Sequence, residues 1–316
     1  LALSEVAYSC ASTAVVMSVH NSIVCESILR YGTEDQKQRF LKPLATGEII
    51  GAFALTEPNA GSDPVRQTSD PVRQTTKAVR DGDSYILNGT KRFITTGKNA
   101  GVVIVTVKTD EAKRHKGISA FLVKKGTPGF TVGPLEDKMG LRGSDTVDLL
   151  FEDCRVPAKD MLGEEGEGFK IAMTGLDGGR IGISAQSVGV AQAALDAAVQ
   201  YAKEREQFGQ SISRFQGLRW MVADMAVDIE AARQLMLSAS AMKDRRENYT
   251  AQASMAKLFS SEMVNRVTAT ALQIHGGYGY IKEYPVERYY RDARVFTIYE
   301  GTSEIQRIVI SNHVFK

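Results

Sequence analysis

The 316-residue sequence contains few of the residues that build disulfide frameworks or metal sites. It has three cysteines and four histidines. Cys10, Cys25 and Cys154 are odd in number and lack the spacing of zinc ligands, and the histidines are too far apart to form a motif. We therefore expect a reducing compartment and no metal.

The sequence also has little net charge and no long hydrophobic run. Its formal net charge is +2, and the basic residues are scattered, which argues against a surface that follows nucleic-acid phosphates. The longest apolar runs, such as 101–107, are far shorter than the ~20 residues of a membrane-spanning helix. We expect neither nucleic acid nor a membrane as a partner.

The start of the chain and a short tandem repeat are both unusual. It begins at Leu1 in sequence typical of the middle of a helix, without a basic leader, which indicates a fragment. The heptapeptide at 62–68 is repeated at once at 69–75. A single tandem copy is too short for a repeat architecture, and its proline and polar content predicts a loop that carries an insertion or a sequence error.

Hydrophobic patterning divides the chain into three parts. Residues 1–48 carry helical signals, with a capped helix start at Thr33 and a stop at Pro43 and Gly47. Residues 49–161 contain short β-rich runs, and Asn88-Gly89 predicts a two-residue hairpin turn between two of them. An antiparallel barrel or sandwich would follow.

Residues 162–316 are predicted to be helical again. From Leu218 to Met236, apolar residues recur at intervals of three and four, as they do from Val188 to Ala198. Long amphipathic helices of this kind form bundles.

The segment 298–307 reads Ile-Tyr-Glu-Gly-Thr-Ser-Glu-Ile-Gln-Arg and places one carboxylate next to a glycine just before a helix. Thr302 or Ser303 can cap that helix. Glu300 then lies on a short lead-in to the helix, although a helix N-terminus favours any acid through its dipole.

Together with Arg-Asp-Ala-Arg at 291–294, this segment resembles the active-site segment of acyl-CoA dehydrogenases, flavoenzymes that desaturate acyl-CoA thioesters between Cα and Cβ. Segments 53–63, 201–209 and 273–279 resemble other signatures of that family. The last is rich in glycine, but no strand precedes it, so it does not fit a dinucleotide-binding fingerprint.

The resemblance covers essentially the whole chain. It implies an α+β fold with a partial N-terminal helical domain at 1–48, an antiparallel β-barrel domain at 49–161 and a C-terminal four-helix-bundle domain at 162–316.

The resemblance also implies FAD as the cofactor and Glu300 as the catalytic base. The implied FAD contacts lie in two strand segments and in the C-terminal helices: Phe53, Leu55, Thr56, Gly61, Ser62, Phe93, Ile94, Thr95, Arg205, Phe208, Phe215, Gln216, Gln273, Ile274, Gly276, Gly277, Thr302 and Glu304. The implied substrate contacts are Ser62, Asp177, Arg180, Tyr299, Glu300 and Gly301. Because of the repeat, Ser62 or Ser69 could occupy the first of these places. Strand alternation would place Phe93 and Thr95 on one face.

Gly179 separates two branches of the family that the chain resembles. Isovaleryl-CoA and long-chain members carry their base immediately before the arginine that corresponds to Arg180, and this chain has glycine there. Glu300 is then left as the base, and the resemblance is greatest to short-chain, butyryl-type enzymes.

The implied reaction converts an acyl-CoA to a trans-2-enoyl-CoA and passes electrons to an electron-transferring flavoprotein. The resemblance also implies a homotetramer in a bacterial cytoplasm or a mitochondrial matrix. An acyl-CoA oxidase, a branched-chain or other acyl-CoA dehydrogenase and a non-catalytic scaffold relative stay open as alternatives. A glutaryl-CoA enzyme is disfavoured because Ala14 stands where that enzyme has an arginine.

Overall fold

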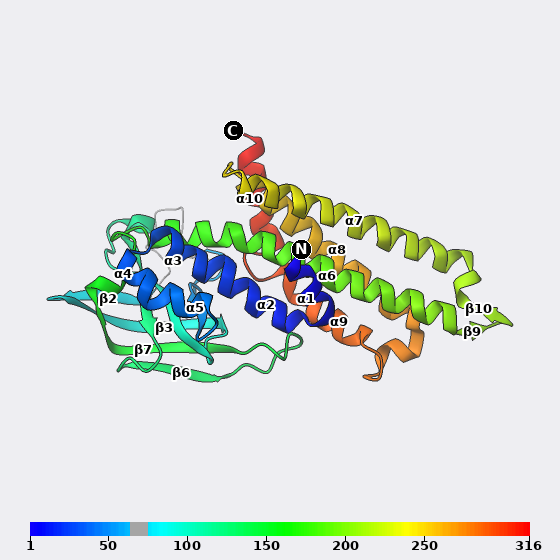
Figure 1. The fold of residues 1–316 in the computed structure, drawn as a ribbon, viewed down its shortest axis with the longest axis horizontal. Helices are drawn as coiled ribbons and strands as arrows, with labels where there is room; N and C mark the ends of the chain where they lie inside the picture. The colour runs from blue at the N-terminus through cyan, green and yellow to red at the C-terminus, as the bar shows by residue number, and fades with distance from the viewer. Residues whose placement is uncertain (64–74) are drawn as a thin grey trace. The chain divides into compact units, whose positions relative to one another are not determined.

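The computed structural model describes residues 1–63 and 75–316, which form two compact units (Figure 1). The helical unit comprises Leu1–Val15, Lys138–Gly143 and Arg180–Lys316, and the sheet unit comprises Val16–Asp137 and Ser144–Gly179. The boundaries of the three predicted domains do not coincide with this division and stay a prediction. Ser69 and most of the repeated heptapeptide lie outside the described residues.

The sheet unit begins with short helical segments. Their bounds are Ala11–Ser18 (α2, which starts in the helical unit), a π-helical segment Val19–Cys25, Glu26–Tyr31 (α3), Glu34–Gln36 (α4), a second π-helical segment Lys37–Leu41, and Lys42–Ala45 (α5). Thr33 caps α4 as predicted: its hydroxyl accepts from the Gln36 N–H at 3.2 Å and its own N–H donates to the Gln36 side chain at 3.1 Å.

The predicted stop at Pro43 is wrong. Pro43 lies in the first turn of α5. A proline is tolerated there because its missing N–H would have no partner within the helix. The helical region ends only at Ala45, before Gly47 with φ +76°.

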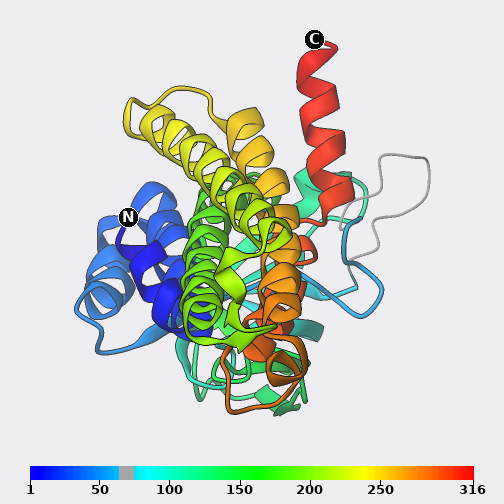
Figure 2. The same ribbon diagram turned by 90° about the vertical axis from the view of Figure 1, so that its right-hand side faces the viewer.

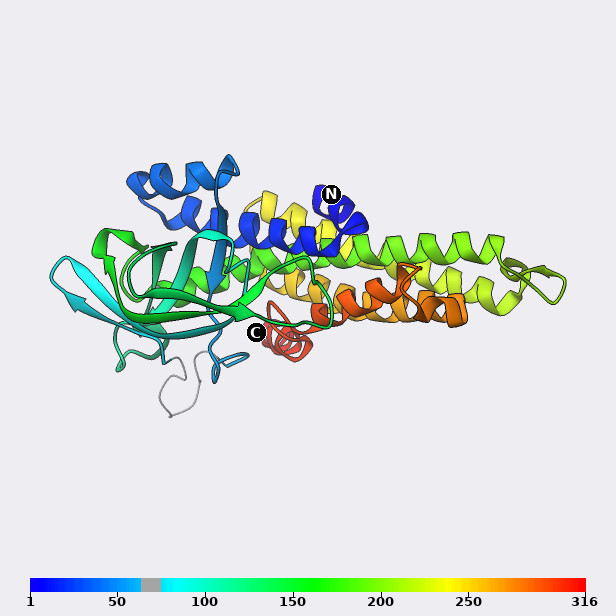
Figure 3. The same ribbon diagram turned by 90° about the horizontal axis from the view of Figure 1, so that it is seen from below.

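Eight strands form one sheet in the order β6-β7-β3-β2-β4-β5-β8, with β1 paired to β4 (Figure 3). The strands are Ile50–Ala54 (β1), Lys77–Asp81 (β2), Ser84–Thr95 (β3), Ala100–Lys108 (β4), Ile118–Lys124 (β5), Phe130–Leu135 (β6), Thr146–Pro157 (β7) and Met161–Leu162 (β8). Most pairs are antiparallel, as predicted, but β4 pairs in parallel with β1 and, at Lys77–Lys108, with β2.

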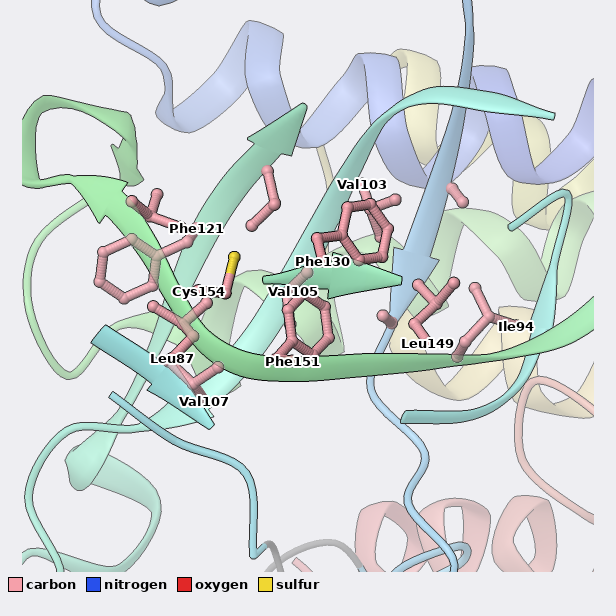
Figure 4. Close-up of a cluster of buried hydrophobic side chains, with 14 of the residues drawn as sticks. Leu87, Ile94, Val103, Val105, Val107, Phe121, Phe130, Leu149, Phe151 and Cys154 are labelled. Atoms are coloured by element: carbon pink, nitrogen blue, oxygen red, sulfur yellow. The ribbon is translucent and has the colours of Figure 1, made fainter. Parts of the chain in front are cut away.

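Strand β4 is mostly apolar, and both of its faces are buried. Val103 and Val105 point into a core that includes the stacked rings of Phe130 and Phe151, 5.1 Å apart (Figure 4). Val102 and Ile104 point the other way, against side chains of the N-terminal helices that include Val24, Ile28, Phe40 and Leu44. Successive side chains of β4 therefore pack alternately into two hydrophobic clusters on opposite faces of the sheet.

The predicted hairpin turn at Asn88-Gly89 is also wrong. Both residues lie inside the continuous strand β3, where the pairing with β7 shifts register between Leu87 and Gly89. Gly89 has φ +142°, and a Cβ there would lie 2.6 Å from the Cα of Thr76. Glycine is needed for a bulge and a close backbone approach rather than for a turn.

The helical unit consists mainly of helices. They are Ala2–Ser9 (α1), Gly168–Glu204 (α6, in this unit from Arg180), Gln216–Asp244 (α7), Thr250–His275 (α8), Val286–Ala293 (α9) and Ser303–Val314 (α10), with a small ribbon of Glu206–Gln207 (β9) and Gln210–Ser211 (β10). Short 3-10 turns cover Arg114–Gly117, Ala158–Asp160, Ile212–Arg214, Gly276–Tyr280 and Arg294–Thr297 across the two units.

Helices α6, α7 and α8 pack through small and flexible side chains. Ile181 and Ala185 of α6 form one buried cluster with Met236 and Ala239 of α7 and with alanines of α8. Figure 2 shows these helices side by side, and α10 packs on α8. The predicted helical bundle is present, and small residues at the contacts allow the helix axes to approach closely.

One helical stretch has the length and composition of a membrane-spanning helix, contrary to our expectation. It covers Ala11–Tyr31 and reaches a mean hydropathy of 1.2. Half of that window is buried inside the structure, as in a core helix, so length and composition are weak evidence for a membrane span.

Candidate active site

Glu300 lies on a tight turn between α9 and α10. Its φ is +51° and that of Gly301 is +91°, so two successive residues adopt the left-handed conformation. A glutamate in this region is uncommon and is held there only when its surroundings enforce it. Thr302 caps α10 as predicted, with the Ile305 N–H donating to its hydroxyl at 3.4 Å.

Two buried side chains hold this turn through its carbonyl oxygens. The Gln306 amide donates to the oxygens of Glu300 at 3.2 Å and Gly301 at 2.9 Å. The Lys257 ammonium, from α8, donates to the same Gly301 oxygen at 2.7 Å. The backbone that carries Glu300 is therefore fixed from two helices.

The carboxylate of Glu300 is buried without a direct partner. Both of its oxygens are inaccessible to solvent, and neither has a hydrogen-bond partner among the described residues. Burial raises the pKa of Glu300 to about 7, against the opposing charges of Lys257 and Arg180. A carboxylate with such a pKa and free oxygens is suited to accept a proton near neutral pH.

Our sequence analysis missed Lys257. The residue is fully buried, and burial lowers the pKa of its ammonium to about 8 while the charge of Glu300 opposes that change. A signal was present in α8, where Lys257 falls at helical spacing among Ala253, Ser260 and Val264 on the buried face. A lysine on such a face requires a polar partner.

Tyr299 is held beside Glu300 by a relay of hydrogen bonds. Its hydroxyl donates to the Gln186 side chain at 2.6 Å, whose amide donates to the Ala11 carbonyl at 2.7 Å. Its ring stacks on Phe296 with centroids 5.7 Å apart. The predicted substrate contacts Tyr299, Glu300 and Gly301 are thus placed together, and Arg180 interacts electrostatically with Glu300.

A cavity of about 670 Å³ lies at the other end of the long helices, beside β9 and β10. It is lined by seven of the predicted cofactor residues: Arg205, Phe208, Phe215, Gln273, Ile274, Gly276 and Gly277. The remaining predicted residue of this region, Gln216, follows directly in α7. Tyr278 also lines the cavity, and the Arg205 guanidinium lies 5.4 Å from the centre of its ring.

This cavity has the chemistry of a nucleotide site. Arginine forks suit phosphate oxygens, and the aromatic side chains offer faces for a base. Gly276, with φ +58°, and Gly277 have open space where a Cβ would stand, so packing within this chain does not explain the glycines. Their open surface allows close approach by a ligand.

In the sheet unit, the two predicted flavin-facing segments lie side by side. The first continues from β1 through Leu55 and Thr56, and the second ends β3 at Phe93, Ile94 and Thr95. They are joined where the Arg92 N–H donates to the Thr56 carbonyl at 2.8 Å. Phe53 is half-buried at the end of β1.

The alternation argument does not apply to Phe93. Its φ of +58° breaks the regular alternation of side chains within β3, and the pairing with β7 shifts register between Lys91 and Ile94. Phe93 is exposed, Ile94 is buried and Thr95 is half-buried. Gly61 and Ser62 are exposed at the end of the described segment, and Asp177 lies in the part of α6 that belongs to this unit.

A buried ion pair supports the first of these segments. Lys91 and Glu57 are joined at 2.8 Å with side chains 0% and 1% exposed, and Lys91 also donates to the Leu55 carbonyl at 3.1 Å. The Glu57 carboxylate further accepts from the N–H groups of Thr75 and Thr76. Burial alone would raise the pKa of Glu57, but the Lys91 charge and these donors hold it below its ordinary value.

Three protein-family models match the chain along most of its length. They describe the N-terminal domain of acyl-CoA dehydrogenase, over residues 1–48, the middle domain, over 52–154, and the C-terminal domain, over 166–315.

Two curated relatives cover the whole chain. A short-chain-specific acyl-CoA dehydrogenase of Clostridium acetobutylicum is 50% identical over 316 residues, which are 100% of this chain and 82% of that protein. An acryloyl-CoA reductase (NADH) of Anaerotignum propionicum is 49% identical and is matched over 100% of this chain and 79% of its own length.

Two solved structures have nearly the same fold. A chain in the structure of the electron transferring flavoprotein of Acidaminococcus fermentans has a TM-score of 0.97 at 50% identity, covering 100% of this chain and 81% of that one. Butyryl-CoA dehydrogenase from Megasphaera elsdenii has a TM-score of 0.96 at 48% identity, with coverage of 100% and 81%.

Proposed function

Because this chain belongs to the acyl-CoA dehydrogenase family, we propose that it dehydrogenates a short-chain acyl-CoA at its α,β-bond, with Glu300 as the base and FAD as the electron acceptor. The observation that carries this proposal is the state of the Glu300 carboxylate. It is buried, it has no hydrogen-bond partner among the described residues, and its pKa is raised to about 7.

The proposed role of Glu300 is to remove the α-proton of the thioester. That proton is only weakly acidic, so the negative charge that develops on the thioester oxygen must be stabilised as the proton leaves. The backbone N–H of Glu300 is the proposed donor to that oxygen. Lys257 and Gln306 fix the backbone that carries this N–H, because they bind the carbonyl oxygens of Glu300 and Gly301.

FAD fits the described residues at two places. The cavity at Arg205, Gln273 and the two glycines suits the adenosine diphosphate half, and the adjoining segments at Thr56 and Thr95 suit the ring. When bound, FAD supplies the acceptor for the β-hydride.

The same cavity also supports a proposal about the oligomeric state of the protein. Phe208, at its rim, is 95% exposed, and an apolar ring so exposed is suited to being covered by another surface. We propose a homotetramer in which a second copy covers this cavity and Arg205 binds the cofactor across the interface.

The proposed electron acceptor is an electron-transferring flavoprotein. This proposal is supported by the structure of the electron transferring flavoprotein of Acidaminococcus fermentans, since that structure contains a chain with nearly the same fold as this one. The proposed compartment is a bacterial cytoplasm or a mitochondrial matrix, and several mammalian relatives are named as mitochondrial.

The proposed substrate is a short acyl-CoA, with butyryl-CoA as the reference compound. One line of support is Gly179, which stands where isovaleryl-CoA and long-chain members of the family carry their base. The other is the similarity to short-chain enzymes. An anaerobic titration with acyl-CoAs of increasing length, followed by bleaching of the flavin absorbance, tests both the reaction and the chain length.

Glu300→Gln should keep its flavin but lose reduction by butyryl-CoA, by about 10²–10⁴-fold or more, because a general base contributes that much to a proton transfer. Since the base must be ionised, the wild-type rate should rise as the pH increases through about 7. Reduction of Glu300→Gln at the wild-type rate would show that the base lies elsewhere.

A second candidate function is the reverse reaction, reduction of a short enoyl-CoA. The 49% identical acryloyl-CoA reductase supports it, and the same base would return a proton to the α-carbon. Measuring both directions with an artificial electron donor and acceptor separates the two candidates.

A further inference from the structure

Lys257 is a buried cation that stands next to the proposed base without contacting its carboxylate. It is 0% exposed, and its ammonium donates to the Gly301 carbonyl at 2.7 Å. The Glu300 oxygens have no hydrogen-bond partner among the described residues. Lys257 is therefore bonded to the backbone of the residue that follows the proposed base, and it acts on the Glu300 carboxylate through its charge.

We propose that Lys257 is a positioning residue for the proposed base: it fixes the left-handed Glu300-Gly301 turn and supplies a buried positive charge that acts on Glu300 without a direct ion pair. The inference rests on the proposed function only in taking Glu300 as the base.

The geometry of the turn explains why a donor is needed at this place. Buried carbonyl groups in a left-handed turn must be satisfied from outside the turn. Gln306 alone serves two carbonyls, and its amide would lie only 2.7 Å from a Cβ at Gly301, so the turn and this side chain are closely matched. Lys257 adds the second donor to the Gly301 oxygen and ties the turn to α8.

The charges around the turn explain why the donor is a lysine. Lys257 from α8 and Arg180 from α6 both favour the ionised form of Glu300, against burial. Burial and the charge of Arg180 oppose the charged form of Lys257. Glu300, Glu304 of α10 and Glu262 of α8 favour it. A carboxylate in a direct pair would have its oxygens occupied and would be a weaker base. A cation held on the Gly301 carbonyl lowers the cost of the anion and leaves the oxygens free for the substrate's proton.

The test compares three substitutions in purified, flavin-containing protein. Lys257→Met removes the donor and the charge, and Gln306→Met removes a donor alone. Ser261→Ala, one turn from Lys257 in α8, is the matched control, because this buried hydroxyl donates to the Leu258 carbonyl of its own helix. We would measure kcat for butyryl-CoA against pH. Infrared difference spectroscopy would follow the ionisation of Glu300 without substrate, with Glu300→Gln identifying its band.

Lys257→Met should lower kcat about 10- to 100-fold, since small misplacements of a reacting group have effects of that size. It should also move the Glu300 titration and the acid limb of the rate profile upward by about one pH unit, the smaller end of the shift caused by one neighbouring charge. Gln306→Met should lower kcat without the pH shift, and Ser261→Ala should change neither. A Lys257→Met protein with the wild-type kcat and titration midpoint would overturn the proposal.

Lys257→Gln keeps a donor for the Gly301 carbonyl but not the charge, so it serves if Lys257→Met does not fold. We expect the same upward pH shift with a smaller loss of kcat, and an unshifted titration would again overturn the proposal. If no acyl-CoA reduces the wild type, the proposed function fails, and the infrared titration still decides the role of Lys257.

Discussion

Each unit of this protein buries a lysine near a glutamate, but the pKa of the carboxyl group is lowered in one unit and raised in the other. In the sheet unit, Lys91 contacts Glu57 directly, and the pKa of Glu57 is held below its ordinary value. In the helical unit, Lys257 binds a neighbouring carbonyl, and burial raises the pKa of Glu300 to about 7. Direct contact stabilises a permanent anion, whereas a lysine that binds a backbone carbonyl instead of the carboxylate leaves a group that can exchange its proton.

The difference matches the role of each segment. Glu57 joins the segment after β1 to Thr75, Thr76 and β3, so its charge is part of the sheet unit's framework. Glu300 is fixed through its backbone only, and its side chain carries the cost of burial. The Lys91–Glu57 pair stabilises the fold, whereas burial of ionised Glu300 lowers the stability of the folded protein at the proposed site of reaction.

The largest effect on stability should come from breaking the direct pair. Glu57→Gln leaves the Lys91 ammonium buried without its counter-charge, so the free energy of unfolding should fall by about 3–5 kcal/mol in urea titrations. The exposed pair Arg155–Asp81 of the same sheet provides the control, and Asp81→Asn should cost less than about 1 kcal/mol. Equal losses for the two variants would contradict the structural role assigned to Glu57.

The same substitution at Glu300 should have the opposite sign. The folded-state pKa of about 7 lies above the unfolded value near 4.5, so the folded protein loses stability as the pH rises through this window. Glu300→Gln does not titrate, and above pH 7 it should be more stable than the wild type by about 3 kcal/mol, at about 1.4 kcal/mol per pKa unit.

Urea unfolding of both proteins across this pH window, without acyl-CoA, measures the difference. The stability gap between variant and wild type should open from about pH 4.5 and become constant above about pH 7. A gap that is independent of pH would mean that Glu300 is not buried as an anion.

A smaller effect should distinguish the two helix caps. Thr33 forms a reciprocal capping box at 3.1–3.2 Å, whereas Thr302 accepts one longer bond of 3.4 Å. Thr33→Ala should destabilise the protein by about 1 kcal/mol and Thr302→Ala by less, as measured by thermal unfolding. Serine at either position should restore most of the loss, and a larger loss at Thr302 would indicate that its hydroxyl has a second role.

Local rules predicted the features that depend on neighbouring residues. The caps at Thr33 and Thr302 are decided within three residues of sequence, and the helical intervals around Leu218 predicted the bundle. Where the same local rules failed, tertiary contacts had overridden them: Asn88-Gly89 became a bulge because Thr76 approaches it closely, and Pro43 was accommodated in the first turn of a helix.

By itself the sequence determined the family resemblance, the order of helical and β-rich regions and the choice of Glu300, because these are written in short contiguous segments. Only the tertiary structure decided the state of that carboxylate. The Lys257–Gly301 bond spans 44 residues and the Lys91–Glu57 pair spans 34, and no local pattern reports such distances. Burial and the position of one ammonium group, both products of folding, separate a structural glutamate from one that can accept a proton.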